Sequence, residues 1–448
     1  MKFSSAAKLL LALICACSAT MIWSQAGSAP APAPLTLTLQ DALARARANS
    51  VQFQAALTDQ GVAHQDKIQA FAALLPSVAY NNQAIYTQPT GNQPAFIAAN
   101  APHEYVSQAN VHEALALSGV SDFHRSRALE AVTRAKAEIA ARGLVVTVVQ
   151  TYYGLLAAQR KYASMQEAAA EAQRFLDLSQ KLENGGEVAH SDVIKAQIQA
   201  QQRQRDLREA QLAMQKGRLD LAVLLFPNFN ENFTIVDDAD LAPPLQSFDE
   251  VARAAQVKNP DVRASSAALQ AARYDLLSAR SGYLPTLTVD YFYGIDAAHF
   301  ATHETVANPT PPPDFLRVNN LGYSVAATIS VPVWNWGATH SKAVQADLRR
   351  KQAERELSFA QRRLQADIRG AHAEADAARS ELDTLRSSAE LSAESLRLTT
   401  IRYQSGEATV LEVVDAQNTL TLARNAYDDG VVRYRVSLAN LQTLTGTM

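Results

Sequence analysis

The chain contains two copies of one segment, and this internal repeat limits the folds open to it more than any other feature. Residues Leu39–Val78 align without gaps on Phe248–Leu287, so that Leu75-Pro76 falls on Leu284-Pro285. Later in each half a Gly-Glu pair recurs, followed by an acid and a valine. Two alanine-rich helices can resemble each other by chance, but the Leu-Pro and Gly-Glu elements recur in the same order. We therefore predict a duplicated fold.

The first residues have the pattern of a secretion signal. Lys2 and Lys8 supply positive charge, Leu9–Ala16 forms an apolar core, and Ser24-Gln25-Ala26 offers a small-residue cleavage site. A lipoprotein site ending at Cys17 is the alternative; both cysteines lie in this segment, so we expect no disulfide in the mature chain. The predicted organisation is a signal peptide over residues 1–26, an Ala/Pro-rich tether over 27–36, a first repeat over 37–226, a connector over 227–247 and a second repeat over 248–448.

The charge and hydropathy of the chain exclude two classes of protein. The 41 basic and 44 acidic residues give a net charge of −3, whereas a nucleic-acid partner would require a basic surface. After the signal we find no apolar run of about 18 residues, so we expect no transmembrane helix. A role in a membrane would therefore require a β-barrel.

Each half predicts the same series of elements. A helix of about 35 residues is ended by a Leu-Pro pair, because proline lacks an amide hydrogen and clashes with the preceding turn. Two strands, a very long helix, a glycine turn and a shorter helix follow. The long helices are expected over about Asp122–Glu183 and Ala338–Tyr403, and each would span roughly 90–100 Å. The shorter helices are expected over about Ser191–Leu225 and Val410–Thr445.

The predicted strands alternate between apolar and polar side chains. Leu287, Val289 and Tyr291, for example, alternate with polar residues, as barrel strands of about ten residues do. Trp334 and Trp336 follow the last strand, where an aromatic girdle at a membrane surface is expected. The alternative is an antiparallel sheet on a soluble domain. Four strands cannot close a barrel, so a membrane assignment requires several chains to share one, and three copies would supply twelve strands.

The long helices carry heptad spacing. Leu382, Ala389, Leu396 and Tyr403 recur every seven residues, which keeps an apolar seam facing a neighbouring helix. An ordinary helical bundle is the alternative, but globular helices are on average far shorter.

This arrangement resembles the outer-membrane efflux protein family, the TolC-like outer membrane factors. The resemblance covers nearly all of the mature chain. It is carried by Leu37-Thr-Leu-Gln-Asp-Ala-Leu43, Leu75-Pro76, Tyr283-Leu-Pro285, Val331-Pro-Val-Trp-Asn-Trp-Gly337 and Gly406-Glu-Ala-Thr-Val-Leu-Glu-Val-Val-Asp-Ala-Gln417.

The resemblance implies a mainly α fold with a small β part. Duplicated coiled-coil hairpins and four strands per chain would form a homotrimer, with a twelve-strand barrel among outer-membrane lipids and a helical tunnel through the periplasm. It implies passive multidrug efflux or type I secretion, with a periplasmic adaptor (a membrane fusion protein) and an inner-membrane pump of the RND, ABC or MFS type. The cargo and the pump class cannot be deduced from this sequence.

The chain departs from the family pattern in two places. Leu117–Asp122 stands where the family has a Pro-Leu-Phe-like element, and the first hairpin turn is expected to be one residue longer than the second. The resemblance also implies that the turns form a periplasmic mouth that meets the adaptor. The turn residues concerned are Asn184, Gly185, Gly186, Ser405 and Gly406.

Acids follow each turn, and they are the candidate pore residues. Asp192, Glu412 and Asp415 would each form a ring of three in a trimer, and such a ring attracts cations. The alternative is that they only favour helix N-termini through the helix dipole. The resemblance favours the ring. It also implies a gate link through Tyr403 and Ser191, with Tyr403 bonded to Asp192, although Ala408 stands where the family's arginine is expected.

No catalytic constellation, phosphate loop or zinc spacing is found, so the sequence predicts neither an enzyme nor a cofactor. His299 and His303 are four residues apart but precede a Pro-rich loop, and we predict no metal site there. The alternative to a channel is a periplasmic scaffold made of coiled coil and a soluble sheet.

Overall fold

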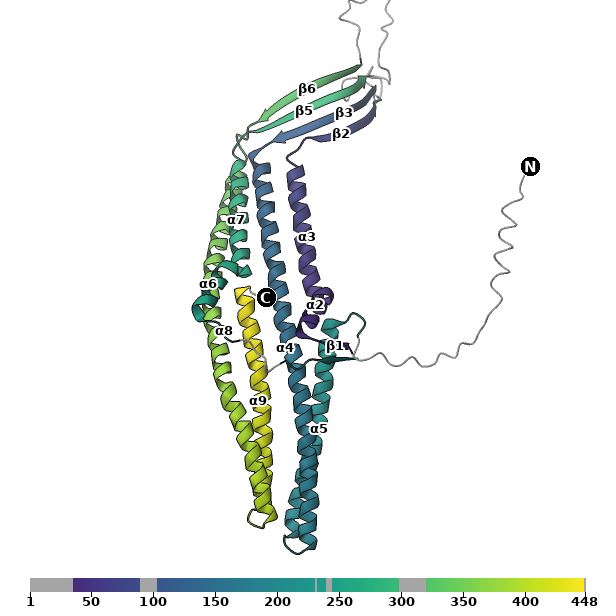
Figure 1. The fold of residues 1–448 in the computed structure, drawn as a ribbon. Helices are drawn as coiled ribbons and strands as arrows, with labels where there is room; N and C mark the ends of the chain where they lie inside the picture. The colour runs from purple at the N-terminus through teal and green to yellow at the C-terminus, as the bar shows by residue number, and fades with distance from the viewer. Residues whose placement is uncertain (1–34, 89–102, 230–231, 239–243, 298–319, 447–448) are drawn as a thin grey trace, which may run out of the picture.

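The computed structural model describes residues 35–88, 103–229, 232–238, 244–297 and 320–446 (Figure 1). The predicted signal peptide with Cys17, the tether up to residue 34, and His299 and His303 lie outside these ranges. Within them, the same series of elements occurs twice. In the first half these are α2 (Leu39–Asn49), α3 (Val51–Ala72), β2 (Ser77–Tyr86), β3 (His103–Leu115), α4 (Leu117–Asn184) and α5 (His190–Leu225). In the second half they are α6 (Phe248–Lys258), α7 (Pro260–Ser281), β5 (Thr286–Ala297), β6 (Leu321–Ser330), α8 (Ala338–Gln404) and α9 (Val410–Thr445).

The first helix of each half is broken, contrary to the expectation of one continuous helix. The Ser50 side chain accepts a hydrogen bond from the amide of Phe53 at 3.3 Å, which caps α3. Asn259 caps α7 in the same way, and Pro260 occupies the first helical position, where a missing amide hydrogen costs nothing. The start of α4 was also predicted too late, because the atypical segment from Leu117 forms its first turn.

The end of the predicted tether belongs to the folded part. β1 (Leu35–Leu37) pairs in parallel with β4 (Phe233–Ile235), a strand of the connector. The Tyr152 hydroxyl on α4 donates to the carbonyls of Leu37 and Val236, at 3.2 and 2.8 Å. The tether boundary at residue 36 is therefore wrong, since the strand that contains the buried Leu37 begins at Leu35.

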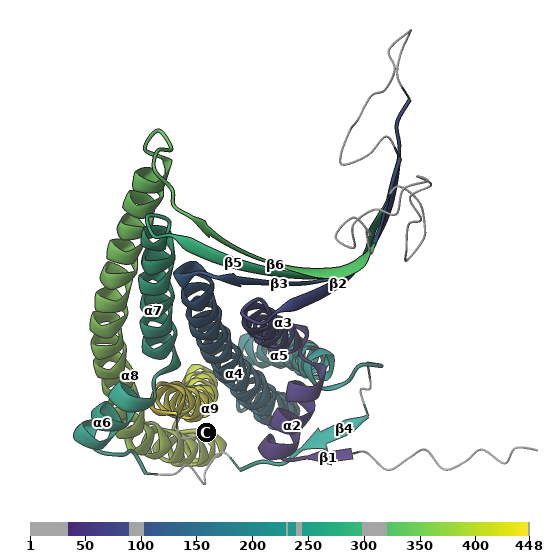
Figure 2. The ribbon, with the colours of Figure 1, turned by 90° about the horizontal axis from the view of Figure 1, so that it is seen from above.

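The four long strands form one antiparallel sheet in the order β2-β3-β5-β6, so β2 and β6 are its two open edges (Figures 1 and 2). The register aligns Val78, Val111, Tyr291 and Val325 in one row across all four strands. Because side chains alternate along a strand, the whole row lies on one face. The neighbouring row, on the other face, contains Ser77, His112, Asp290 and Ala326, and the His112 Nδ1 lies 2.7 Å from the Asp290 carboxylate. The predicted alternation is confirmed.

Below the sheet, α4 and α8 continue as two long helices, each paired with a shorter one (Figure 1). At 68 and 67 residues they are each about 100 Å long. The central core is formed by α4, with Tyr152, Tyr153 and Leu155 almost fully buried, and it includes Leu221 and Leu225 of α5. By length and composition α4 would qualify as a membrane-crossing helix, contrary to the expectation from sequence, but its Val145–Leu156 segment supplies this core.

Candidate functional site: the tips of the two helical hairpins

The hairpins α4–α5 and α8–α9 end in turns of the same length and conformation. Residues 185–189 form the first turn and residues 405–409 the second. Gly186 and Gly406 have φ of +76° and +72°, in the left-handed region that glycine enters without strain. The amide after each glycine donates to a carbonyl of the last helical turn, at 2.9 and 2.8 Å. The expectation of a longer first turn is therefore wrong: Gly185, with φ of −80°, occupies the same position in the first turn as Ser405, with φ of −89°, in the second.

The three predicted pore acids lie near the N-termini of α5 and α9, Asp192 and Glu412 in the first turn and Asp415 in the second, and their surroundings differ. Asp192 accepts a hydrogen bond from Lys195 at 3.1 Å, one turn further along the same helix. Glu412 binds the N-terminus of α9, where Thr409 is the N-cap residue. Asp415 is exposed, and among the described residues no partner contacts its carboxylate. Two of the acids therefore have a cation partner, since Arg402 lies 3.6 Å from Glu412, which also caps its helix. Asp415 has neither role among the described residues.

Thr409 and Glu412 form a capping box. The Glu412 amide donates to the Thr409 hydroxyl and the Thr409 amide donates to the Glu412 carboxylate, at 3.4 and 3.1 Å. These bonds, first of all the one from the Thr409 backbone, lower the pKa of Glu412, and Arg402 adds to the effect. The corresponding N-cap residue of α5 is Ala189, which makes no cap bond.

We expect Thr409→Ala to destabilise the first turn of α9 by about 1 kcal/mol, and Ala189→Ser to stabilise that of α5 by a similar amount. Hydrogen exchange of the tip amides would measure both changes. The lowered pKa of Glu412 also means that its contribution is present at neutral pH and is lost as the pH falls through that pKa. Equal exchange in all three proteins would contradict the assignment of the cap.

Tyr403 is a buried link between the hairpins, but its partner is not the expected one. Its hydroxyl lies 3.1 Å from the Ser179 hydroxyl, with Ser179 fully buried and Tyr403 3% exposed. The ring of Phe175 packs against the Tyr403 ring, with centroids 5.0 Å apart. Within the chain, the expected Tyr403–Asp192 bond is therefore wrong. Ser191 is exposed and contacts neither of them through a hydrogen bond in the part of the chain that the structure describes.

Among the further polar links between the hairpins, two lie near the tips, and sequence analysis missed both. The Asn418 side chain on α9 accepts hydrogen bonds from Gln199, at 3.3 Å, and from Arg203 on α5. Arg424 on α9 binds Glu167 on α4 at 2.8 Å. Because the partners are 215 to 257 residues apart, no local motif links them. The burial of Arg203, which is 6% exposed, marks its importance, but it is visible only in the structure. We call these two links and Tyr403–Ser179 the inter-hairpin contacts.

Comparison with known proteins agrees with this architecture. Residues 251–447 match the family model described as outer membrane efflux protein. The chain is 24% identical over 372 residues to the outer membrane protein OprJ of Pseudomonas aeruginosa, which covers 79% of this chain and 73% of OprJ. It is 22% identical to Escherichia coli TolC over 313 residues, which covers 68% of this chain and 62% of TolC.

The second half of this chain, residues 251–447, belongs to the outer membrane efflux protein family, and the whole chain resembles members of that family. Its fold is that of the family: the crystal structure of the outer membrane protein VceC from Vibrio cholerae superposes with a TM-score of 0.78 at 15% identity, covering 91% of this chain and 96% of VceC. As an efflux protein of this family it lies in the outer membrane, with its long helices in the periplasm. The hairpin tips are then the end of the molecule farthest from the membrane (Figure 1).

At the opposite end of the helices, the two predicted girdle residues follow the last strand of this efflux protein. Trp334 and Trp336 lie between β6 and α8, with 74% and 89% of their surfaces exposed. Their rings pack edge to face with centroids 5.8 Å apart. A pair of exposed indoles at the junction of strands and helices is suited to the headgroup layer of a bilayer. The girdle therefore remains a prediction that the geometry favours.

Proposed function

We propose that three copies of this chain form a passive exit duct through the outer membrane and across the periplasm. The observation that carries the proposal is the sheet, which has one mainly apolar face, a mainly polar opposite face and two unpaired edge strands. Val78 and Val325, on the edge strands β2 and β6, are 74% and 64% exposed on the apolar face. A monomer cannot place this face in lipid, because unpaired backbone groups are not tolerated there.

Sheets from several copies of the chain can pair edge to edge into a closed barrel that keeps the antiparallel order of the strands. β6 runs antiparallel to β5, and β2 antiparallel to β3, so β6 of one copy beside β2 of the next continues an all-antiparallel order. Three copies, the number implied by the family, give twelve strands, which is within the range of known barrels. The apolar face would then contact lipid and the row that contains His112 and Asp290 would line the lumen.

The hairpin tips are the proposed binding site for the periplasmic partner of the duct. Three chains with two equivalent turns each would present six similar glycine turns at the periplasmic mouth, and we propose that a periplasmic adaptor binds there. An inner-membrane pump of the RND, ABC or MFS type would deliver the cargo, for efflux or for type I secretion. The duct itself performs no chemistry.

Fractionation tests this proposal against the periplasmic scaffold. We expect a heat-modifiable trimer in the outer membrane that conducts ions in planar bilayers. Recovery of the chain as a soluble periplasmic protein would favour the scaffold and contradict the duct. The apolar face of the sheet argues against the scaffold, because a soluble protein rarely exposes so large an apolar surface.

The acids at the mouth make a further prediction about ion selectivity. We expect the triple variant Asp192→Asn, Glu412→Gln and Asp415→Asn to lose most of its cation preference in reversal-potential measurements, because carboxylate rings in a narrow pore attract cations. Glutamine at 412 keeps the helix cap, since it also accepts the Thr409 bond. Asp415→Asn alone should have the largest single effect, because its carboxylate has neither a cation partner nor a cap role among the described residues. Unchanged selectivity in the triple variant would exclude the ring.

A further inference from the structure

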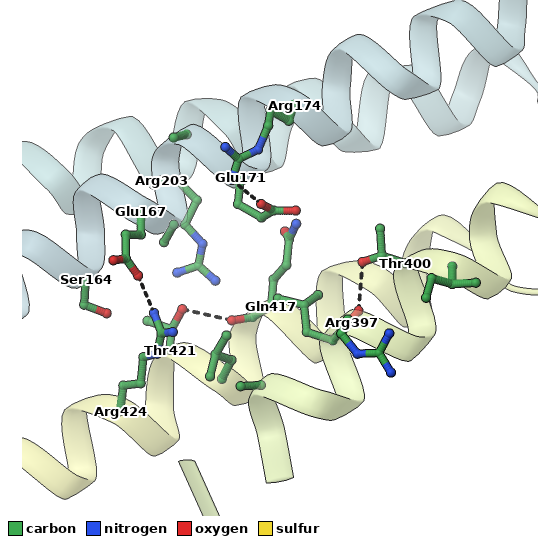
Figure 3. A pocket seen from close by; sticks show the side chains of 16 residues that line it. Ser164, Glu167, Glu171, Arg174, Arg203, Arg397, Thr400, Gln417, Thr421 and Arg424 are labelled. Carbon is green, nitrogen blue, oxygen red and sulfur yellow. Dashed lines mark hydrogen bonds and ion pairs between the residues drawn. The ribbon is translucent and has the colours of Figure 1, made fainter. Parts of the chain in front are cut away.

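A cavity of about 570 Å³ lies between the two hairpins, above the tips (Figure 3). Its walls come from α4 and α5 on one side and from α8 and α9 on the other. Apolar side chains, including Leu396 and Leu420, form part of the wall. Its charged lining residues are Glu167, Glu171, Arg174, Arg203, Arg397 and Arg424. Each arginine is paired with one acid: Arg174 with Glu171, Arg203 with Asp206, Arg397 with Glu394 and Arg424 with Glu167. Because a guanidinium has five N–H donors, the cavity combines an apolar surface with arginine donors that remain beyond these ion pairs.

One buried polar side chain in this cavity is left without partners. Gln417 on α9 is 6% exposed, and neither its Oε1 nor its Nε2 makes a hydrogen bond within the described parts of the chain. In Figure 3 its side chain extends from α9 toward Glu171 and Arg203. Buried amides nearly always find partners, because an unsatisfied donor or acceptor loses its hydration without compensation. Gln417 thus offers a donor and an acceptor to a molecule bound in the cavity.

We propose that the cavity binds a small amphipathic organic anion that carries an amide, of the N-acyl amino acid class. Its carboxylate would accept hydrogen bonds from the arginine N–H groups that the ion pairs leave available, and Arg203, one of these arginines, is itself buried among protein atoms. Its amide supplies the acceptor and the donor that Gln417 Nε2 and Oε1 need. Its acyl chain would pack against Leu396 and Leu420. The volume is in the range of ordinary small-molecule sites.

The position of the cavity gives such a ligand a consequence for the duct. Glu167 and Arg424, on opposite walls, already join the hairpins at 2.8 Å, and the ligand would contact the same two walls. A molecule that binds better when the walls are close favours that arrangement. We expect the bound anion to reduce channel opening. This second step rests on the proposed function, whereas binding itself does not.

Calorimetry on the complete, purified protein with N-hexanoylglycine tests the site. We expect saturable binding that weakens at least tenfold in Gln417→Leu, because a buried hydrogen-bonding group is lost. The matched control is Gln197→Leu, at the equivalent but exposed position of the first repeat, which should bind as the wild type does. The uncharged amide of hexanoylglycine and the cation hexyltrimethylammonium should bind at least tenfold more weakly than the anion.

A folding control separates loss of the site from loss of the structure. Gln417→Leu should be as thermally stable as the wild type or more stable, because it replaces an unsatisfied buried amide with an apolar group of similar size. No saturable binding by the wild type, or equal binding by Gln417→Leu, would overturn the proposal. Binding without any effect on conductance would overturn only its effect on opening, and absence of conductance would concern the proposed function instead.

Discussion

Val325→Arg should abolish assembly in the outer membrane, whereas Ser324→Arg, at the adjacent position, should leave it largely intact. Val325 lies in the middle of β6, in the row that contains Val78, Val111 and Tyr291. If this face contacts lipid, an arginine near the centre of the bilayer costs roughly 2–4 kcal/mol. A trimer carries the substitution three times, so the total cost is comparable to the stability of a typical domain.

Ser324 is a stringent control because it differs from Val325 only in the face to which it belongs. It pairs with Phe292, and its row lies on the side assigned to the lumen. Both variants should be extracted from membranes and compared by the amount of heat-modifiable trimer, with helix content by circular dichroism as a check on folding. Equal assembly of the two variants would mean that the apolar face does not contact lipid, and would favour the scaffold.

The duplication and the period-2 alternation were sufficient to predict most of the fold. The alternation is a local signal, and the duplication compares one half of the chain with the other. As predicted, Leu75-Pro76 and Leu284-Pro285 precede β2 and β5, and both short hairpin helices end at the predicted residues. The breaks at Ser50 and Asn259 were missed although their signals were present, because the apolar pattern continues across them. A capping side chain before Pro260 outweighs that pattern.

The candidate site was predicted less well, for a physical reason. The glycine turns and acids were found because short segments specify them, whereas the inter-hairpin contacts depend on how distant helices pack. Ser179 and Tyr403 are 224 residues apart, and neither belongs to a motif that identifies the other. The unpartnered Gln417 is likewise visible only once both hairpins surround it.

Removing two of the three inter-hairpin contacts should make the duct open more readily. We expect Tyr403→Phe combined with Asn418→Ala to increase the open fraction in planar bilayers at least tenfold. Tyr403→Phe leaves the Ser179 hydroxyl buried without its partner, and Asn418→Ala removes the acceptor of the buried Gln199 amide and one of the two acceptors of Arg203, which keeps Asp206. An unsatisfied buried group costs about 1–3 kcal/mol, so two such groups, Ser179 and Gln199, together cost at least about 2 kcal/mol per protomer, more than the 1.4 kcal/mol that corresponds to a factor of ten.

The substitutions destabilise only the arrangement in which the hairpins are in contact. When the hairpins separate, these groups are exposed to water, which supplies the missing hydrogen bonds. The substitutions therefore shift the equilibrium and do not merely weaken the protein. Tyr162→Phe is the matched control. Tyr162 lies on α4, the helix that contains Ser179, but its hydroxyl bonds only Gln166, four residues along the same helix, at 2.8 Å. That variant should conduct as the wild type does. If the double variant did so too, the contacts between the hairpins would be structural, and opening would be controlled where neighbouring copies of the chain meet.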